Sequence, residues 1–352
     1  MNKLFSWVRG DESAQPIPQK RVKLALQGGG AHGAFTWGVL DHLLEDGRLG
    51  IDGISGASAG AVNAVMLADG LIRGGPEEAR KRLADFWRAA SIDGSLPGFS
   101  RHFVDQLSAA SVPMKTWLTS MGRFLSPSHM NPLNINPLKQ LIERFVDFEA
   151  LRNSDRELFI SATNAQSGNL RLFTRDELTA EVVMASACLP LLFRPVRIDD
   201  VPYWDGGYVS NPPLLPFLQT RASTDVLLVQ IFPLRRDRAP TSSREIVGRT
   251  AEIAFNAPLL AELRGLAAVD RVAEQAASRL RLHRIVLDEL TERPDPNSRL
   301  NNDYKFFQML HERGREAARR FLAAHFDAIG SQSTMDAASE SRSGICPPIN
   351  PC

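Results

Sequence analysis

The chain has 352 residues, of which 43% are hydrophobic, and a formal net charge of +1. This composition is typical of a globular protein with one large domain or two small ones, and the near-zero charge provides no positive field to hold a nucleic acid. The three cysteines, Cys188, Cys346 and Cys352, make no metal-ligand cluster, so we predict no metal site and a cytoplasmic protein. No window approaches the ~20 apolar residues of a membrane span, and the N-terminus lacks a secretory signal pattern. Any contact with membranes is therefore expected to be peripheral.

The first elements alternate between strands and helices. Residues 1–20 are polar and contain prolines, which predicts a disordered leader. The apolar run at 21–27 predicts a buried strand, and helical spacing of apolar residues predicts a helix over 35–47. A second short strand at 51–58 and a second helix at 61–72 follow. This alternation implies right-handed crossovers and a mostly parallel sheet.

The pattern is less regular in the next segment. A charged amphipathic helix is predicted at 77–90, and residues 136–151 are again helical. Between them, at about 93–134, the segment holds glycine, proline and serine together with many large apolar residues. This composition fits either a cap or lid over a site or helices packed on the core, and the sequence leaves both interpretations open.

Further strands and helices follow in the second half of the chain. Residues 157–173 predict two strands around the turn signal "QSGN". Buried strands are predicted at 224–233 and 282–289, and helices at 244–280 and 303–326. We expect one core over residues 21–215, a region at 216–328 packed on the same domain, and a flexible tail at 331–352.

A glycine-rich loop, "GGGAHG" at 28–33, joins the first strand to the first helix. Gly28, Gly30 and Gly33 satisfy the dinucleotide fingerprint G-x-G-x-x-G, and Asp52 lies near the distance at which an acid is expected. The same loop could present backbone N–H groups to the oxyanion of an ester under attack. The loop alone does not choose between these two chemistries.

A serine between glycines, "GASAG" at 56–60, lies between an apolar strand and a helix of small residues. This is the setting of a nucleophile elbow, in which a sharp turn lifts a hydroxyl out of the sheet. Ser58 would then lie at a helix N-terminus, where the dipole favours developing negative charge. A plain tight turn is the alternative interpretation.

A serine nucleophile needs a base, and none of the seven histidines lies in an obvious loop after a late strand. The better candidate is Asp205 in "DGG" (205–207), which follows a strand-like stretch. Asp-Gly could also be a simple hairpin turn. An aspartate of ordinary pKa is a weak base for a hydroxyl, but a desolvated pocket would raise its basicity.

Four motifs in this order resemble the patatin-like phospholipases: "GGGAHG" (28–33), "GASAG" (56–60), "ASACLP" (185–190) and "DGG" (205–207). The resemblance covers roughly residues 21–215 and implies a three-layer α/β/α fold with a Ser–Asp dyad. It implies that Ser58 is the nucleophile and Asp205 the general base. The oxyanion hole would be formed by the N–H groups of Gly28, Gly29 and Gly30, with supporting roles for His32, Gly33, Gly56, Gly60, Gly206 and Gly207.

The function implied by this resemblance is hydrolysis of fatty acyl esters, as in a phospholipase A, without a cofactor or metal. The expected partner is a lipid or acyl ester, with peripheral membrane contact and no nucleic acid; the oligomeric state does not follow from the sequence. The family often has arginine or lysine where this chain has His32, which can be neutral at pH 7. Charge assistance to the oxyanion from this position therefore does not follow. A dinucleotide-binding oxidoreductase and a non-catalytic lipid-binding or regulatory module are the two alternatives.

Overall fold

The structure is a computed structural model, and it describes residues 18–91, 137–190, 192–220, 224–236, 238–272, 280–287, 298 and 301–336. Several expectations fall wholly or partly outside these residues: most of the leader at 1–20, the cap or lid at about 93–134, the last part of the helix at 244–280, the last two residues of the strand at 282–289, and the tail beyond residue 336. They stay predictions.

An eight-stranded sheet forms the centre of the described chain, in the order β5-β6-β3-β2-β1-β7-β8 with β4 paired to β3. The neighbouring pairs β3–β2, β2–β1, β1–β7 and β7–β8 are parallel. The pairs β3–β4, β3–β6 and β5–β6 are antiparallel. The expectation of a mostly parallel sheet is therefore confirmed. The strands are β1 (Lys20–Leu26), β2 (Leu49–Gly56), β3 (Glu157–Asn164), β4 (Leu170–Thr174), β5 (Val196–Ile198), β6 (Val201–Asp205), β7 (Asp225–Gln230) and β8 (Arg281–Val286).

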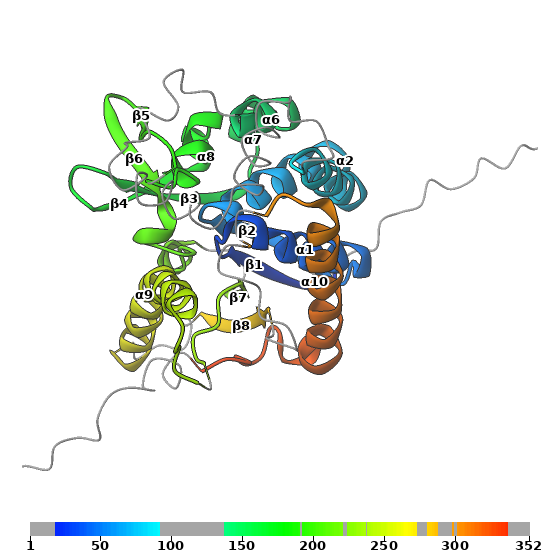
Figure 1. Ribbon diagram of the computed structural model, residues 1–352. Helices are drawn as coiled ribbons and strands as arrows, with labels where there is room; N and C mark the ends of the chain where they lie inside the picture. Colours follow the sequence, from blue (N-terminus) through cyan, green and yellow to red (C-terminus); the bar gives the residue numbers. More distant parts are fainter. Residues whose placement is uncertain are drawn as a thin grey trace, which may run out of the picture.

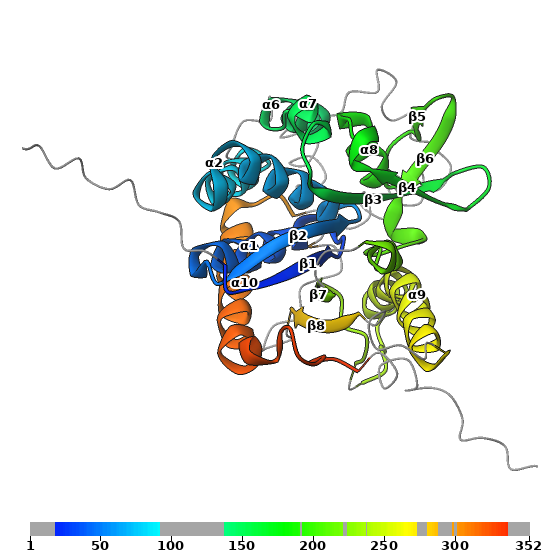
Figure 2. The same ribbon diagram turned by 180° about the vertical axis from the view of Figure 1, so that it is seen from behind.

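Helices cover both faces of the sheet, which gives the three-layer α/β/α architecture (Figures 1 and 2). The side chains of β1 show why. Val22, Leu24 and Leu26 pack into one buried cluster with residues of α1 (Gly33–Asp46), α2 (Ala59–Ala89) and α10 (Tyr304–His325). Ala25 points to the other face, into a smaller cluster with residues of α9 (Ser243–Val272). A strand buried on both faces is typical of a parallel sheet between helical layers.

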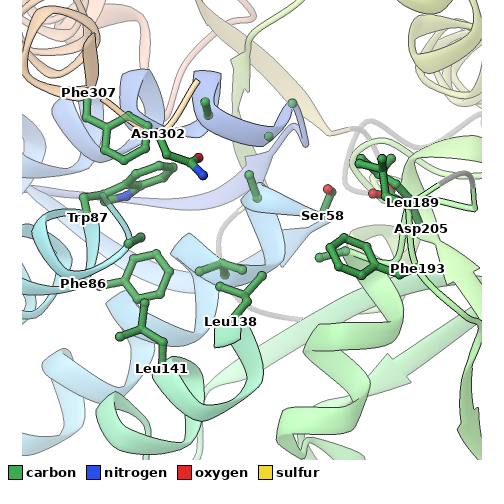
Figure 3. Close-up of a pocket in the computed structure, with 18 of the residues that line it drawn as sticks. Ser58, Phe86, Trp87, Leu138, Leu141, Leu189, Phe193, Asp205, Asn302 and Phe307 are labelled. Atoms are coloured by element: carbon green, nitrogen blue, oxygen red, sulfur yellow. The ribbon is translucent and has the colours of Figure 1, made fainter. Parts of the chain in front are cut away.

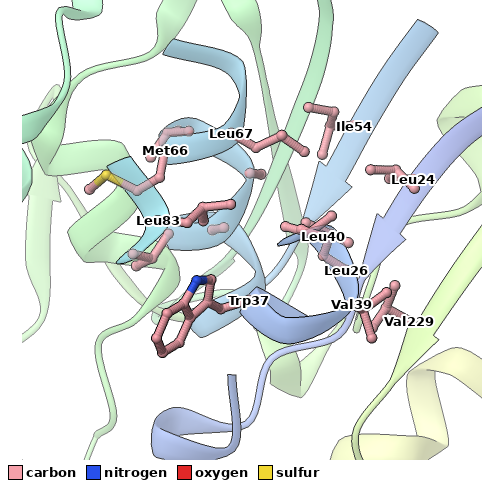
Figure 4. Packing of buried hydrophobic residues seen from close by; sticks show 14 of the residues in the cluster. Leu24, Leu26, Trp37, Val39, Leu40, Ile54, Met66, Leu67, Leu83 and Val229 are labelled. Carbon is pink, nitrogen blue, oxygen red and sulfur yellow. The ribbon is translucent and has the colours of Figure 1, made fainter. Parts of the chain in front are cut away.

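The larger cluster is built from segments that are far apart in the sequence (Figure 4). Leu24 and Leu26 of β1 meet Leu40 of α1, and Met66 and Leu83 of α2 close the cluster from the side. Helix α2 contains both of the helices expected at 61–72 and 77–90, with a kink at Gly74 and Gly75. The gap between the two predicted helices therefore corresponds to a real break in the helical backbone.

Shorter helical segments complete the fold. They are η1 (Gly30–His32), α6 (Pro137–Phe145), α7 (Phe148–Arg152), η3 (Arg175–Glu177), α8 (Ala180–Ser186), η4 (Gly206–Tyr208), η5 (Leu215–Gln219) and η8 (Phe326–Ala328). None of the described helices has a stretch long and apolar enough to cross a membrane.

The C-terminal region belongs to the same sheet and core, because β7 and β8 extend the sheet beyond β1 and α10 packs on α1. The tail expected from residue 331 begins later. The N–H groups of Thr334 and Met335 donate to the carbonyl of Leu282 on β8, and the Met335 side chain is buried. The prediction was wrong for residues 331–336 because one buried methionine and two backbone hydrogen bonds anchor an otherwise polar stretch.

Candidate active site

Ser58 lies in a sharp turn between β2, which ends at Gly56, and α2, which begins at Ala59. Its backbone has φ +53° and ψ −124°, a conformation that non-glycine residues rarely adopt and that costs of order 1–3 kcal/mol. The turn is tight: a Cβ on Gly60 would lie 2.0 Å from the carbonyl oxygen of Leu26. The strand, the strained serine and the following helix have the backbone geometry expected of a nucleophile elbow.

The third sequence motif supports this elbow. Helix α8 ends at Ser186, and the Ser186 hydroxyl oxygen accepts a hydrogen bond from the backbone N–H of Ser58 at 2.9 Å. Both residues are buried. The segment "ASACLP" thus contacts the elbow directly, a role that its composition of small residues did not reveal.

Asp205 lies at the end of β6 and is fully buried. It begins the short helix η4 as its N-cap, with Oδ1 accepting the N–H of Gly207 at 2.7 Å, so the Asp-Gly-Gly sequence is not a hairpin turn. Among the described residues, Oδ2 has no hydrogen-bond partner. Burial raises the pKa of Asp205 to about 7, against the opposing effects of the nearby Ser58 hydroxyl and the Gly207 N–H. A carboxyl with this pKa can exchange a proton near neutral pH.

The glycine loop approaches the elbow from β1. A Cβ on Gly28 would lie 2.7 Å from the Cβ of Ser58, so only glycine allows this contact. Gly29 is the N-cap of η1 and Gly30 its first residue, and both line the same cavity as Ser58. N–H groups at the start of a helix have no acceptor within the helix. These two N–H groups can therefore serve a ligand.

Gly28 differs from the expectation. Its N–H donates to Oδ1 of Asn211 at 2.7 Å and is not available to an oxyanion. The prediction that Gly28 belongs to the oxyanion hole is therefore corrected: its N–H makes a structural contact with Asn211. Asn211 follows Asp205 by six residues, and nothing in its local sequence pattern indicated the contact.

The remaining motif residues lie around these groups. His32 is buried, with Nε2 2.7 Å from the Ser298 hydroxyl and its ring centroid 6.5 Å from that of Phe232 and 6.0 Å from that of Phe306, and it is not among the residues that line the cavity. Gly33 begins α1, Gly56 ends β2, and Gly206 and Gly207 begin η4.

Asp52, the acid in the dinucleotide interpretation, is remote from the glycine loop. It is the bulged residue of β2, opposite the step from Val22 to Lys23, and its carboxylate pairs with Arg21. Lys23 precedes Gly28 by five residues, about 16 Å along an extended strand. The carboxylate that this interpretation needs next to the loop is therefore elsewhere.

A cavity of about 490 Å³ opens beside Ser58 and Asp205 (Figure 3). Ser58 and Asp205 lie at one side of it, and Phe86, Trp87 and Phe307 at the other. Apart from Ser58, Asp205 and Asn302, its lining residues are apolar or glycine: Gly29, Gly30, Ala31, Ala59, Val62, Phe86, Trp87, Ala90, Pro137, Leu138, Leu141, Ala187, Leu189, Leu192, Phe193, Phe232, Phe255 and Phe307. No local sequence pattern indicated that these distant aromatic residues meet.

Comparison with known proteins places the chain in a family. The family model "Patatin-like phospholipase" matches residues 24–218, which is more than half of the chain. Among solved structures, VipD from Legionella pneumophila is 18% identical, with a TM-score of 0.43 over 88% of this chain and 67% of that one. The ExoU–SpcU complex from the type III secretion system of Pseudomonas aeruginosa gives 17% identity and a TM-score of 0.39, over 88% of this chain and 52% of that one.

The chain thus spans about two thirds of VipD and about half of the ExoU–SpcU match. No curated protein sequence matches it. The family model covers all four sequence motifs, including the elbow and the Asp205 box. The chain belongs to the patatin-like phospholipase family.

Proposed function

We propose that this protein is a lipid acyl hydrolase that cleaves fatty acyl esters with Ser58 as nucleophile and Asp205 as general base. Membership of the family implies lipid ester hydrolysis. The observation that carries the specific assignment is the pairing of a strained, cavity-lining serine with a fully buried carboxyl of raised pKa. One oxygen of this carboxyl has no hydrogen-bond partner among the described residues, so it is free to take a proton.

In the first step, the ionised Asp205 takes the hydroxyl proton of Ser58 as its Oγ bonds to the ester carbonyl carbon. The carbonyl π electrons move to its oxygen, and the tetrahedral oxyanion lies against the N–H groups of Gly29 and Gly30. When the intermediate collapses, the bond to the alcohol oxygen breaks and Asp205 returns its proton to that oxygen. An acyl–Ser58 ester remains.

In the second step, Asp205 takes a proton from water as the water oxygen attacks the acyl carbon. The same loop holds the second oxyanion, and collapse releases the fatty acid while Ser58 regains its proton. Each oxyanion donor of this kind contributes on the order of 10²–10³ to turnover. The strained elbow holds the hydroxyl at the start of α2, where the helix dipole favours negative charge.

The cavity supports a long acyl chain as the group transferred. Its wall is almost entirely apolar, and burial of each methylene contributes about 0.8 kcal/mol. No cationic side chain is among its described lining residues, so the cavity wall offers no positive charge to pair with a phosphate or other anionic head group. The acyl chain is therefore proposed to lie in the cavity and the alcohol part of the lipid outside it.

Two exposed apolar side chains lie at the rim of the cavity. Leu192 lines it and is 42% exposed, and Tyr208, also 42% exposed, packs against the ring of Phe255, another lining residue. Such side chains favour contact with a lipid surface. We propose that the protein meets its substrate by peripheral contact at this rim.

The test is hydrolysis of a p-nitrophenyl acyl ester by the wild type and two variants. Ser58→Ala and Asp205→Asn should lose activity by a factor of about 10³ or more and keep the wild-type circular dichroism. Ser154→Ala and Asp225→Asn are matched controls, because the Ser154 hydroxyl donates to the carbonyl of Leu151 on α7 and Asp225 begins β7, and neither residue lines the cavity. Wild-type activity in Ser58→Ala would show that the assignment is wrong.

A further inference from the structure

We propose that Asn211 is a positioning residue that holds the oxyanion loop in place, and that α9 in turn holds Asn211. This inference rests on the proposed function. The glycines of the loop have no side chains to fix their own backbone, so the direction of the Gly29 and Gly30 N–H groups depends on what holds the neighbouring peptides. Helix α9 begins at Ser243, after the last residue matched by the family model.

The side-chain amide of Asn211 joins the loop to α9. Its Oδ1 accepts the N–H of Gly28 at 2.7 Å, and its Nδ2 donates to the carbonyl of Phe255 on α9 at 3.2 Å. The side chain is fully buried. Because the acceptor and the donor ends are both engaged, the amide can lie in only one orientation, and it fixes the Gln27–Gly28 peptide, next to the Gly28–Gly29 peptide that carries the Gly29 N–H.

Gln27, the residue before the loop, is tied to the same helix. Its Oε1 accepts the N–H groups of Ile231 at 2.7 Å and Phe232 at 2.9 Å, and its Nε2 donates to Oδ1 of Asn256 on α9 at 3.0 Å. Gln27 and Asn256 are both buried. Gln27 therefore holds the start of the loop both to the segment that follows β7 and to α9.

Glu262 fixes the segment that carries Asn211. Its carboxylate accepts the N–H groups of Leu214 at 2.6 Å and Leu215 at 3.0 Å, and the hydroxyl of Ser210 donates to it as well. These contacts bracket Asn211 on both sides. Three positions of α9, at 255, 256 and 262, thus hold the two segments that meet at the Gly28–Asn211 hydrogen bond.

The consequence concerns the transition state more than the bound substrate. Displacement of a catalytic group by about 1 Å can cost on the order of 10² in rate. Loss of the Asn211 contact would let the loop move relative to Ser58 without changing the apolar wall that binds the acyl chain. Turnover should therefore fall while the affinity for the acyl chain stays the same.

The experiment compares Asn211→Leu, which removes both hydrogen bonds at similar volume, and Asn256→Leu with the wild type. Asp225→Asn is the control for a loss of buried polar contacts. It weakens the pairs of Asp225 with Arg281 and His283 at the start of β7, whereas the contacts of Gln27 lie just after the end of this strand. Active sites are counted by titration with a fluorophosphonate, so that kcat refers to reactive enzyme only. Three constants are measured: kcat, KM and the inhibition constant of a long-chain trifluoromethyl ketone, which forms an oxyanion with a serine.

We expect Asn211→Leu to lower kcat per active site by about 10–10² with KM within twofold, and to weaken the ketone by the same factor as kcat/KM. Asn256→Leu should show the same pattern with a smaller loss, and Asp225→Asn should keep the wild-type constants. Wild-type kcat per active site in Asn211→Leu, or an equal loss in Asp225→Asn, would overturn the inference. Failure of the proposed function is a separate result, because it would appear as retained activity in Ser58→Ala.

Discussion

Gly56 and Asp205 lie along the same edge of strand β3, where they pair with Ile160 and Ala162. Residues along a strand are about 3.3 Å apart, so the two pairing positions are separated by about 7 Å. Ser58 follows Gly56 by two residues. The elbow and the Asp205 carboxyl are therefore brought together by strand register, which holds groups more rigidly than a loop would.

The pH dependence of hydrolysis should report Asp205. Its pKa is about 7, and only the ionised form can take the Ser58 proton. We expect kcat/KM to rise about tenfold per pH unit below pH 7 and to level off above it. The measurement uses an ester with no ionisable group, so that the titration belongs to the enzyme. An apparent pKa near 4 would contradict this account.

The same burial disfavours the ionised form of Asp205, so this residue lowers the free energy of unfolding at neutral pH. The folded-state pKa of about 7 lies above the unfolded value of about 3.9, so between these values the folded protein binds a proton that the unfolded chain has lost. Stability therefore falls as pH rises through this window, by roughly 4 kcal/mol in total. Asp205→Asn removes this dependence and can still accept the Gly207 N–H.

Urea unfolding at pH 4, 6 and 8 checks this prediction. The stability of Asp205→Asn relative to the wild type should increase from pH 4 to pH 7 and then stay constant. A difference that does not change with pH would show that the carboxyl is not desolvated in the folded protein.

The tight turn after Ser58 predicts a large effect at Gly60. A Cβ there would meet the carbonyl oxygen of Leu26 at 2.0 Å, so Gly60→Ala must push the elbow away from β1. We expect a loss of about 3 kcal/mol or more in unfolding free energy. Gly265→Ala on α9 is the matched control, because its nearest neighbour would be Leu215 Cδ2 at 3.9 Å, and it should stabilise by about 1 kcal/mol. Equal effects in chemical denaturation would contradict the packing described for the elbow.

The cavity predicts a preference for long acyl chains. In a series of p-nitrophenyl esters, kcat/KM should rise by up to about fourfold per methylene until the cavity is full. Leu141→Trp enlarges a lining side chain of α6 on the side away from Ser58, so it should reduce this rise and lower the optimal chain length (Figure 3). Gln140→Trp, at an exposed position on the same helix, is the control. The same chain-length profile in both variants would show that the acyl chain binds elsewhere.

Much of the fold follows from local patterns. The apolar runs that became β1, β2, β7 and β8 could be assigned because strands buried on both faces are continuously apolar. The elbow around Ser58 could also be predicted, because its glycines, serine, strand and helix are adjacent in the sequence. Asp205 was found because a short motif marks it.

Contacts between distant segments could not be predicted in this way. Gly28 belongs to the glycine pattern that predicted the loop, but its N–H donates to Asn211, and only the folded chain shows that these two residues meet. Trp87 and Phe307 likewise read as ordinary core residues on two helices, but they form one wall of the cavity. Long-range pairing of this kind depends on register and packing across the whole sheet, which no local window contains.

The most direct test of the dyad is covalent labelling followed by mass spectrometry. A fluorophosphonate should phosphonylate the Ser58 oxygen with loss of fluoride, and the adduct should map to the peptide that contains Ser58. Because we propose that Asp205 takes the proton in this reaction, Asp205→Asn should slow labelling by about 10² or more. An adduct on another residue, or a wild-type labelling rate in Asp205→Asn, would contradict the central claim.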